Sequence, residues 1–143
     1  MSNLSYRTMS SQDFDALLEL WEHTPGVDIT AADSPTGFRS FLDRNPKLSF
    51  VATVDDRIIA GLMCGHDGRR GFIHHLVVIP EFRRQGVASM LVDKSLNKLE
   101  QLGIEKCHLF IRRDNPEGLA FWESIGWKER LELTMASYVL EKG

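Results

Sequence analysis

The spacing of apolar residues changes along the chain, and each change marks a boundary between predicted elements. Between short apolar runs, apolar residues recur three or four positions apart, as on one face of an amphipathic helix. The pattern predicts strands that alternate with helices, which is an α/β arrangement. The apolar runs of strand character are Leu4 to Thr8, Leu48 to Val54, Ile58 to Gly65, Phe72 to Ile79 and Lys106 to Ile111.

Four helices are predicted from this spacing. The first follows Ser10 or Ser11, either of which can cap it. The third is the longest, running from Val87 to Leu102 with Gly103 as its stop. The fourth is short and lies between Asn115 and Gly126. The apolar faces of the first three carry Phe14, Leu17, Leu18 and Trp21, then Phe38, Phe41 and Leu42, then Met90, Leu91, Leu96 and Leu99.

The connections between the strands predict a mixed sheet. Asp55-Asp56-Arg57 is a hairpin signal and residues 67–71 turn the chain again, so the strands up to Ile79 form an antiparallel meander. The long helix from Val87 joins the next two strands by a right-handed crossover, which makes those strands parallel neighbours. No linker or repeat interrupts the chain. We therefore expect a single domain over residues 1–143, with two closing strands up to Leu140.

The composition narrows the class of protein. The 143 residues are 43% hydrophobic, enough for one domain with a proper core. A formal net charge of -3 argues against a protein that holds nucleic acid by its phosphates. The sequence has no signal pattern and no apolar stretch of about 20 residues, so we expect a soluble cytoplasmic protein. Cys64 and Cys107 lie in apolar runs without metal-ligand spacing, and we expect buried reduced thiols and no bound metal.

Candidate chemistry concentrates in residues 76–91. An apolar strand ends there, a short basic segment follows, and Gly86 stands where the long helix begins. The first N–H groups of such a helix lack internal partners and the helix dipole adds positive potential, so the position suits a phosphate or pyrophosphate. Gly86 and Ala88 are small enough for an anion to approach the backbone. Arg83 and Arg84 add positive charge and bidentate contacts.

The spacing Arg83-x-x-Gly86-x-Ala88, preceded by Val78-x-Pro80, resembles the acetyl-CoA signature of the GNAT (Gcn5-related N-acetyltransferase) superfamily. The order of elements also resembles the GNAT order over essentially the whole chain, and the sequence looks most like the small bacterial YpeA-type members. This resemblance implies a mixed, mostly antiparallel sheet of six to seven strands with helices on both faces. It further implies a parallel pair of strands splayed at the cofactor site, and acetyl-CoA as the acetyl donor.

The resemblance assigns residues to the cofactor. Leu76, Val77 and Val78 would present backbone groups along the pantetheine arm. Asn115 matches a family asparagine that contacts the cofactor, although a helix cap alone explains it equally well. The residues that would hold the pyrophosphate are Arg83, Arg84, Gln85, Gly86, Val87, Ala88 and Ser89.

Two positions depart from the family pattern. Trp122 stands where many members have a tyrosine that protonates the departing CoA thiolate, and an indole N–H cannot act as an acid. Phe110 stands where the branch that acetylates the N-terminus of a ribosomal protein has a catalytic glutamate, so we do not expect that activity. Tyr138, in the final predicted strand, is the candidate to replace the missing acid, and Tyr6 is the other phenol. An aromatic strand residue is the simpler explanation of Tyr138.

A base is also needed, because acetyl transfer requires a neutral amine and an alkyl ammonium has a pKa near ~10. His74 lies at the position of a base histidine in the arylalkylamine acetyltransferase branch, and a group that titrates near neutrality suits the task. A hydrogen-bonded histidine in a half-buried sheet is the simpler explanation. By alternation along the strand, Phe72, His74, Leu76 and Val78 share one face and His75 points to the other.

The leading hypothesis is an acetyl-CoA-dependent N-acetyltransferase that moves acetyl directly to an amine of a small molecule, peptide or protein. The alternatives are a catalytically weak CoA- or acyl-CoA-binding sensor or interaction module, and a transferase of bulkier acyl groups. Segment 25–35 is rich in turn formers. Loops of this size in compact domains often cover a binding site. Its Asp28 and Asp33 could attract a cationic amine, but each alone is more simply a solubilising surface residue. A homodimer through the late strands would be unremarkable for the family.

Overall fold

The computed structural model describes residues 3–140, which fall into two compact units. The first unit extends to Arg112 and the second begins at Arg113. Among the described residues, the first unit contains a β-sheet with helices packed on it, and the second contains one short α-helix.

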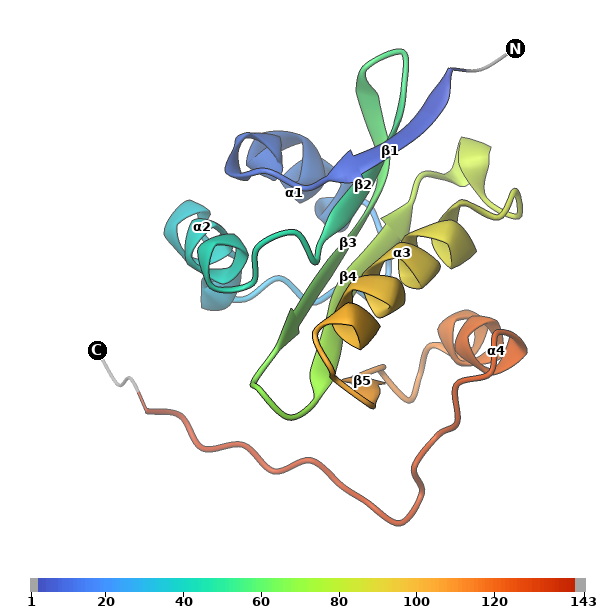
Figure 1. Cartoon of the computed structure of the whole chain (residues 1–143). Helices are drawn as coiled ribbons and strands as arrows, with labels where there is room; N and C mark the ends of the chain where they lie inside the picture. The colour runs from blue at the N-terminus through green and yellow to red at the C-terminus, as the bar shows by residue number, and fades with distance from the viewer. Residues whose placement is uncertain (1–2, 141–143) are drawn as a thin grey trace. The chain divides into compact units, whose positions relative to one another are not determined.

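The first unit is built on a five-stranded mixed sheet (Figure 1). The first four strands form an antiparallel meander, and the fifth pairs parallel to the fourth. Both features were predicted and are confirmed. The strands, in their order across the sheet, are β1 (Leu4–Thr8), β2 (Phe50–Val54), β3 (Arg57–His66), β4 (Gly71–Val78) and β5 (Cys107–Leu109).

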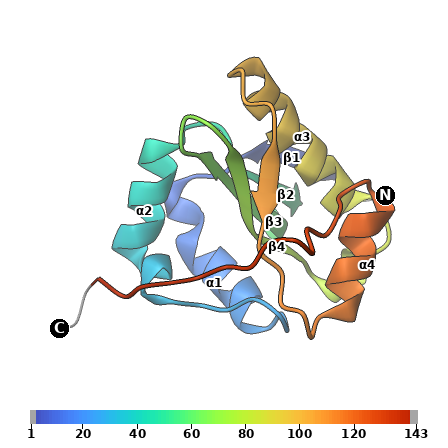
Figure 2. The same cartoon turned by 90° about the horizontal axis from the view of Figure 1, so that it is seen from below.

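Helices cover both faces of this sheet, with α1 (Phe14–Glu22) and α2 (Pro35–Arg44) on one side and α3 (Val87–Gln101) on the other (Figure 2). The side chain of Ser34 caps α2, and Ser10 caps the short turn that leads into α1. Gly103 follows α3 with φ +81°, as predicted for a helix stop. Among residues 3–140, no helix has both the length and the apolar composition needed to cross a membrane.

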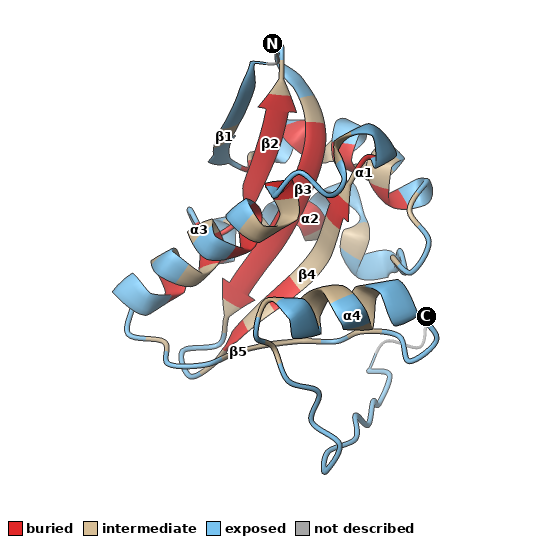
Figure 3. Ribbon diagram, turned by 90° about the vertical axis from the view of Figure 1, so that its right-hand side faces the viewer, coloured by how far each residue is buried: buried red, intermediate tan, exposed pale blue. Residues whose placement is uncertain are grey.

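The core lies between the sheet and its helices, and β2 and β3 are buried along almost their whole length (Figure 3). On the α1 and α2 side, the rings of Phe14, Trp21 and Phe38 form an aromatic cluster with centroids 5.4 to 6.3 Å apart. On the other side, α3 buries Leu91 and Leu99. Close packing on both faces fixes the position of β4, the strand that carries the candidate histidines.

β4 contains one residue more than β3 over the same stretch of sheet. Gly61 pairs with Val77 and Met63 pairs with His74, so two steps along β3 face three steps along β4. His75 lies inside this bulge and has φ +50°. A left-handed backbone costs a non-glycine residue about 1–2 kcal/mol, so the surrounding structure must hold His75 in place.

The bulge changes which way His75 points. The ring of His74 packs against Phe41 of α2, and the ring of His75 packs against Trp21 of α1. Both histidines therefore face the layer formed by α1 and α2. The prediction that His75 points to the opposite face of the sheet is wrong, because strict alternation holds only while the two strands advance in step.

The second unit contains α4 (Pro116–Ser124), the short helix that was predicted. Asn115 caps it, with its Oδ1 accepting a hydrogen bond from the Gly118 amide at 3.1 Å. Gly126 follows the helix with φ +96°. The helix thus begins and ends where the sequence signals lie.

Residues 128–140 form no strand, so the described sheet has five strands and not the predicted six to seven. The two closing strands were expected from the apolar residues of this segment, yet those residues are exposed, from 59% at Leu133 to 88% at Leu140. Pairing and packing with a neighbouring strand supply most of a strand's stability. A β-type composition alone therefore does not make a strand.

We predict that Ser49→Ala lowers the free energy of unfolding by about 1–3 kcal/mol. Ser49 is buried, and its hydroxyl accepts from the Cys64 amide at 2.9 Å and donates to the Cys64 carbonyl at 3.3 Å. Alanine leaves both backbone groups unpaired. Urea denaturation measures the change, with Ser40→Ala on the exposed side of α2 as the control. Equal stability of the two variants would contradict the prediction.

Candidate active site

The turn between β4 and α3 has the backbone of an anion-binding site. Residues Pro80–Phe82 form a short 3-10 turn, and Arg84 and Gly86 then adopt left-handed conformations with φ +61° and +82°. Gly86 is the N-cap of α3, and no side chain caps the helix there. Among the described residues, no acceptor pairs with the backbone amides of residues 84–89. A row of unpaired N–H groups at the start of a long helix favours an anion.

Two side-chain bonds hold this loop in shape. Nε of Arg83 donates to the Val78 carbonyl at 2.9 Å, which ties the loop to the end of β4. Nε2 of Gln85 donates to the Glu81 carbonyl at 3.0 Å. Val87 is buried and anchors the first turn of α3 in the core. The loop is therefore fixed on its inner side before any ligand binds.

The outer side of the loop is open. A Cβ atom added to Gly86 would meet no heavy atom within 4 Å, and the side chain of Arg84 is exposed beside it. Unpaired amides, a nearby guanidinium and open space above the backbone together fit a pyrophosphate group. The chemistry of the loop thus fits the pyrophosphate of the cofactor that the sequence motif implies.

The sheet opens next to this loop. β4 pairs with β5 only from Gly71 to Ile73, opposite Cys107 to Leu109, although β4 itself continues to Val78. Among the described residues, no strand pairs with that edge of β4 from His74 onward, and the Val78 carbonyl there accepts from Nε of Arg83. Unpaired strand edges present N–H and C=O groups that an extended ligand can bind. Leu76, Val77 and Val78, the predicted pantetheine contacts, lie on this open stretch.

His74 lies half-buried at the start of the opening. Its ring meets Phe41 edge to face, with centroids 5.7 Å apart. Burial lowers the pKa of His74 below its ordinary value of 6.5, and the neighbouring His75 lowers it further, while Asp33 acts in the opposite direction. Burial and the neighbouring His75 therefore favour the neutral form of this imidazole.

His75 has a closer partner than His74. Its Nε2 lies 2.9 Å from Oδ1 of Asp33, and the two side chains are only 17% and 10% exposed. Its ring also rests on Trp21, with centroids 4.9 Å apart. A carboxylate on one side and an indole on the other fix the orientation of this imidazole.

Asp33 is held in place by its own turn. It ends the short 3-10 turn Ala31–Asp33, where its Oδ2 accepts from the Thr30 amide at 2.9 Å. The Thr30 hydroxyl in turn accepts from the Ala32 amide at 3.2 Å. This capping box occupies one carboxylate oxygen and directs the other to His75. Asp33 is therefore not the solubilising surface residue that the sequence suggested.

Trp21, beneath His75, carries an unpaired polar group. The residue is 1% exposed, and its Nε1 is the one buried side-chain nitrogen or oxygen without a hydrogen-bond partner among residues 3–140. An unpaired buried donor costs about 1–3 kcal/mol. Such costs are rare in folded proteins and are concentrated at functional sites.

The remaining candidates belong to the second unit. Asn115 caps α4, so the cap explanation of this residue is correct, and its role toward the cofactor stays a prediction. Trp122 packs between the rings of Phe121 and Trp127, at centroid distances of 5.2 and 4.8 Å. Tyr138 is 78% exposed, and its role as the acid also stays a prediction.

Comparison with known proteins decides the family. Residues 14–127 match the acetyltransferase (GNAT) family. This chain belongs to the GNAT family. It is 30% identical over 140 residues to an acetyltransferase of Pectobacterium atrosepticum, which covers 96% of this chain and 97% of that protein. It is also 30% identical over 127 residues to an acetyltransferase of Yersinia enterocolitica, with 87% and 88% covered.

Solved structures show the same GNAT fold. Ard1 of Thermoplasma volcanium superposes with a TM-score of 0.76 at 21% identity, over 86% of this chain and 81% of that one. The PaiA N-acetyltransferase of Thermoplasma acidophilum, solved in complex with coenzyme A, gives a TM-score of 0.76 at 19% identity, over 88% and 90%. With its family and fold established, the chain is an acyltransferase.

Two residues of this GNAT site were missed by sequence reasoning. Asp33 and His75 are 42 positions apart in the sequence, and this spacing does not predict a hydrogen bond between them. The available signals were Thr30 three residues before Asp33, which is a capping-box pattern, and the pair of adjacent histidines in a strand. A bulge cannot be foreseen from a single strand, because it depends on the length of the partner.

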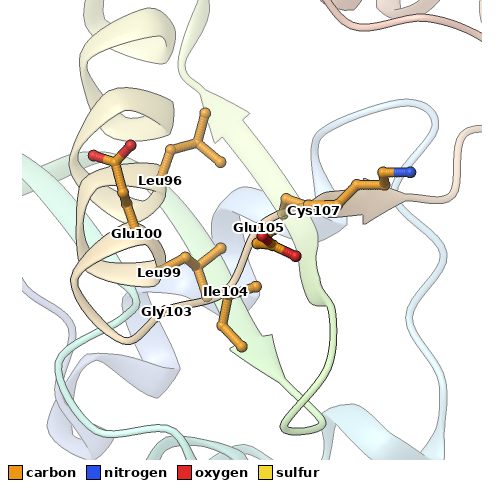
Figure 4. Close-up of a pocket in the computed structure, with 8 residues that line it drawn as sticks. Leu96, Leu99, Glu100, Gly103, Ile104, Glu105 and Cys107 are labelled. Carbon is orange, nitrogen blue, oxygen red and sulfur yellow. The ribbon is translucent and has the colours of Figure 1, made fainter.

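A cavity of about 550 Å³ lies elsewhere, at the C-terminal end of α3 (Figure 4). Leu96 and Leu99 on α3 face the segment that leads into β5. The helix is 15 residues long, about 22 Å, so the cavity lies far from the loop at the other end of α3. It is lined by Leu96, Leu99, Glu100, Gly103, Ile104, Glu105, Lys106 and Cys107.

We predict that the two thiols of the folded protein react slowly with Ellman's reagent at pH 8. Burial raises the pKa of Cys64 to about 12 and that of Cys107 to about 11. Only about one Cys107 side chain in a thousand is then a thiolate at pH 8. Colour should develop faster as the pH rises toward 11, and 6 M guanidinium should release both thiols at once. Rapid reaction of the folded protein at pH 8 would contradict the prediction.

Proposed function

We propose that this chain transfers an acetyl group from acetyl-CoA directly to the amine of a small molecule, peptide or protein. The observation that carries the proposal is the row of unpaired amides at residues 84–89, which follows the open edge of β4. These two features lie in a chain of the GNAT family. Together they support an extended ligand with a pyrophosphate at one end.

Each part of the cofactor would have its own receptor. The amides of residues 84–89 and the guanidinium of Arg84 would hold the pyrophosphate, and the edge of β4 from Leu76 to Val78 would bind the pantetheine arm. Asn115 uses its Oδ1 to cap α4, and only the family resemblance assigns it to the cofactor. Acetyl-CoA would supply an activated acetyl thioester. Bringing it together with an amine in one site would account for much of the rate.

The acceptor would be an amine, and structurally similar proteins act on different classes of amine. One solved neighbour is a ribosomal-protein-S18-alanine N-acetyltransferase of Escherichia coli, and another is an aminoglycoside acetyltransferase solved with sisomicin. Both similarities are near 20% identity and extend only to the fold. All such acceptors are cationic amines at neutral pH and must lose a proton before they attack.

We predict that the wild type binds acetyl-CoA and CoA, and that Gly86→Glu weakens binding at least about tenfold, or 1.4 kcal/mol. Glutamate there adds bulk and a like charge where the pyrophosphate should lie. Gly68→Glu is the matched control. Gly68 also has a left-handed backbone, with φ +91°, and open space around its Cβ position, but it lies in the turn between β3 and β4. Isothermal titration calorimetry measures the affinity of the wild type and of both variants for acetyl-CoA and CoA.

The outcomes separate the hypotheses. Binding that survives in Gly68→Glu but not in Gly86→Glu would support the loop as the cofactor site. Equal losses in both variants would point to a general effect of glutamate at a left-handed position and would contradict it. Binding without turnover of any amine would favour a CoA sensor. Faster turnover with longer acyl-CoA thioesters would favour a different donor.

A further inference from the structure

His75 and Asp33 form a polar pair that the proposed cofactor site does not use. The 2.9 Å contact joins Nε2 of His75 to Oδ1 of Asp33, across 42 residues of sequence. The other carboxylate oxygen is already occupied by the Thr30 amide. Each oxygen of the Asp33 carboxylate therefore has a defined hydrogen-bond partner.

This contact determines where His75 carries its proton. A carboxylate only accepts hydrogen bonds, so Nε2 must be the protonated nitrogen of the neutral ring and Nδ1 must carry the lone pair. Nδ1 has no hydrogen-bond partner among residues 3–140, and it is not among their buried unpaired atoms. It is therefore not fully buried. With Nε2 directed to Asp33, Nδ1 is the nitrogen left to accept a proton.

The bulge places His75 beside the opening in the sheet. Pairing between β4 and β5 ends at Ile73, two residues before His75. The left-handed backbone of His75 brings its ring to the face that also carries His74. An acyl chain that follows β4 from the loop toward this point would end next to the two histidines.

The two histidines differ in their support. No side chain among residues 3–140 donates a hydrogen bond to His74 or accepts one from it, and its ring rests on Phe41. His75 has a carboxylate and an indole that fix its tautomer and orientation. The contacts thus favour His75 over His74, to which the sequence resemblance gave this role.

The geometry points to His75 as the general base that deprotonates the acceptor amine, with Asp33 as the residue that positions it. This inference rests on the proposed function. The N–H bond of the ammonium breaks, its proton goes to Nδ1 of His75, and the electron pair stays on the amine nitrogen. That pair then forms the C–N bond while the C–S bond breaks. The second amine proton ends on the CoA sulfur, and His75 returns the first to solvent.

Two substitutions separate the roles of the pair. His75→Gln keeps an amide that can donate to Asp33 but cannot take a proton. In Asp33→Asn, the side-chain oxygen is needed for the Thr30 amide, so the amide nitrogen faces His75. Nε2 must then accept a hydrogen bond, and the proton moves to Nδ1. His74→Gln tests the rival candidate base. The control is Asp28→Asn on the same segment as Asp33, where an exposed aspartate pairs with Arg112.

The first test needs no acceptor. Two-bond ¹H–¹⁵N correlation spectra of the free protein at pH 7.5 report the tautomer of each histidine. We expect the proton of His75 on Nε2 in the wild type and in Asp28→Asn, and on Nδ1 in Asp33→Asn. A wild-type His75 that carries its proton on Nδ1, or a tautomer that Asp33→Asn does not change, would overturn the assignment.

The second test uses spermidine, kanamycin and an alanine-led peptide as acceptors. We expect His75→Gln and Asp33→Asn to lower kcat/KM at least about 100-fold, with the calorimetric affinity for CoA retained. Asp28→Asn should change it little, and His74→Gln should cost less than His75→Gln. A large loss in His74→Gln with none in His75→Gln would overturn the proposal in favour of His74. Wild-type binding of acetyl-CoA without turnover of any acceptor would count against the proposed function, and the tautomer test would still decide the arrangement of His75.

Discussion

Between the pairs Gly61–Val77 and Met63–His74, β4 carries one residue more than β3, and the backbone accommodates it by taking His75 into a left-handed conformation. Aromatic packing from α1 and the hydrogen bond that His75 donates to Asp33 hold this bulge. Past it, β4 runs on without β5, and its exposed edge leads to the loop before α3. The open edge of β4 and the two adjacent histidines thus occur together at the bulge in β4.

The two ends of the site are supported in different ways. The loop at Gly86 depends on local backbone geometry, since two left-handed residues and an uncapped helix start leave its amides free. The histidine end depends on contacts between distant segments, since Asp33 comes from the connection between α1 and α2. This division suits a family in which one donor is shared and the acceptors differ. The part proposed to bind the donor is formed by local contacts, and the part proposed to face the acceptor is formed by contacts between distant segments.

The sequence was sufficient where the determining interactions are local. The cap at Asn115, the stop at Gly103 and the motif around Gly86 all act within a few residues, and the corresponding elements were predicted correctly. It was insufficient where a distant partner decides. The orientation of His75 depends on the length of β3, and the burial of Asp33 depends on β4. Residues 128–140 form no strand although their composition favours one.

The separation of 42 residues between Asp33 and His75 also bears on how the protein reaches its working state. Contacts between distant segments form only after loop closure has been compensated by other contacts, so this one should appear late in folding. It should also be among the first to open in native-state fluctuations, because the segment that carries Asp33 is short and largely exposed. Chemical competence would then be lost at temperatures where the sheet is still intact. Heat inactivation would precede unfolding, and activity would be a more sensitive measure of integrity than secondary structure.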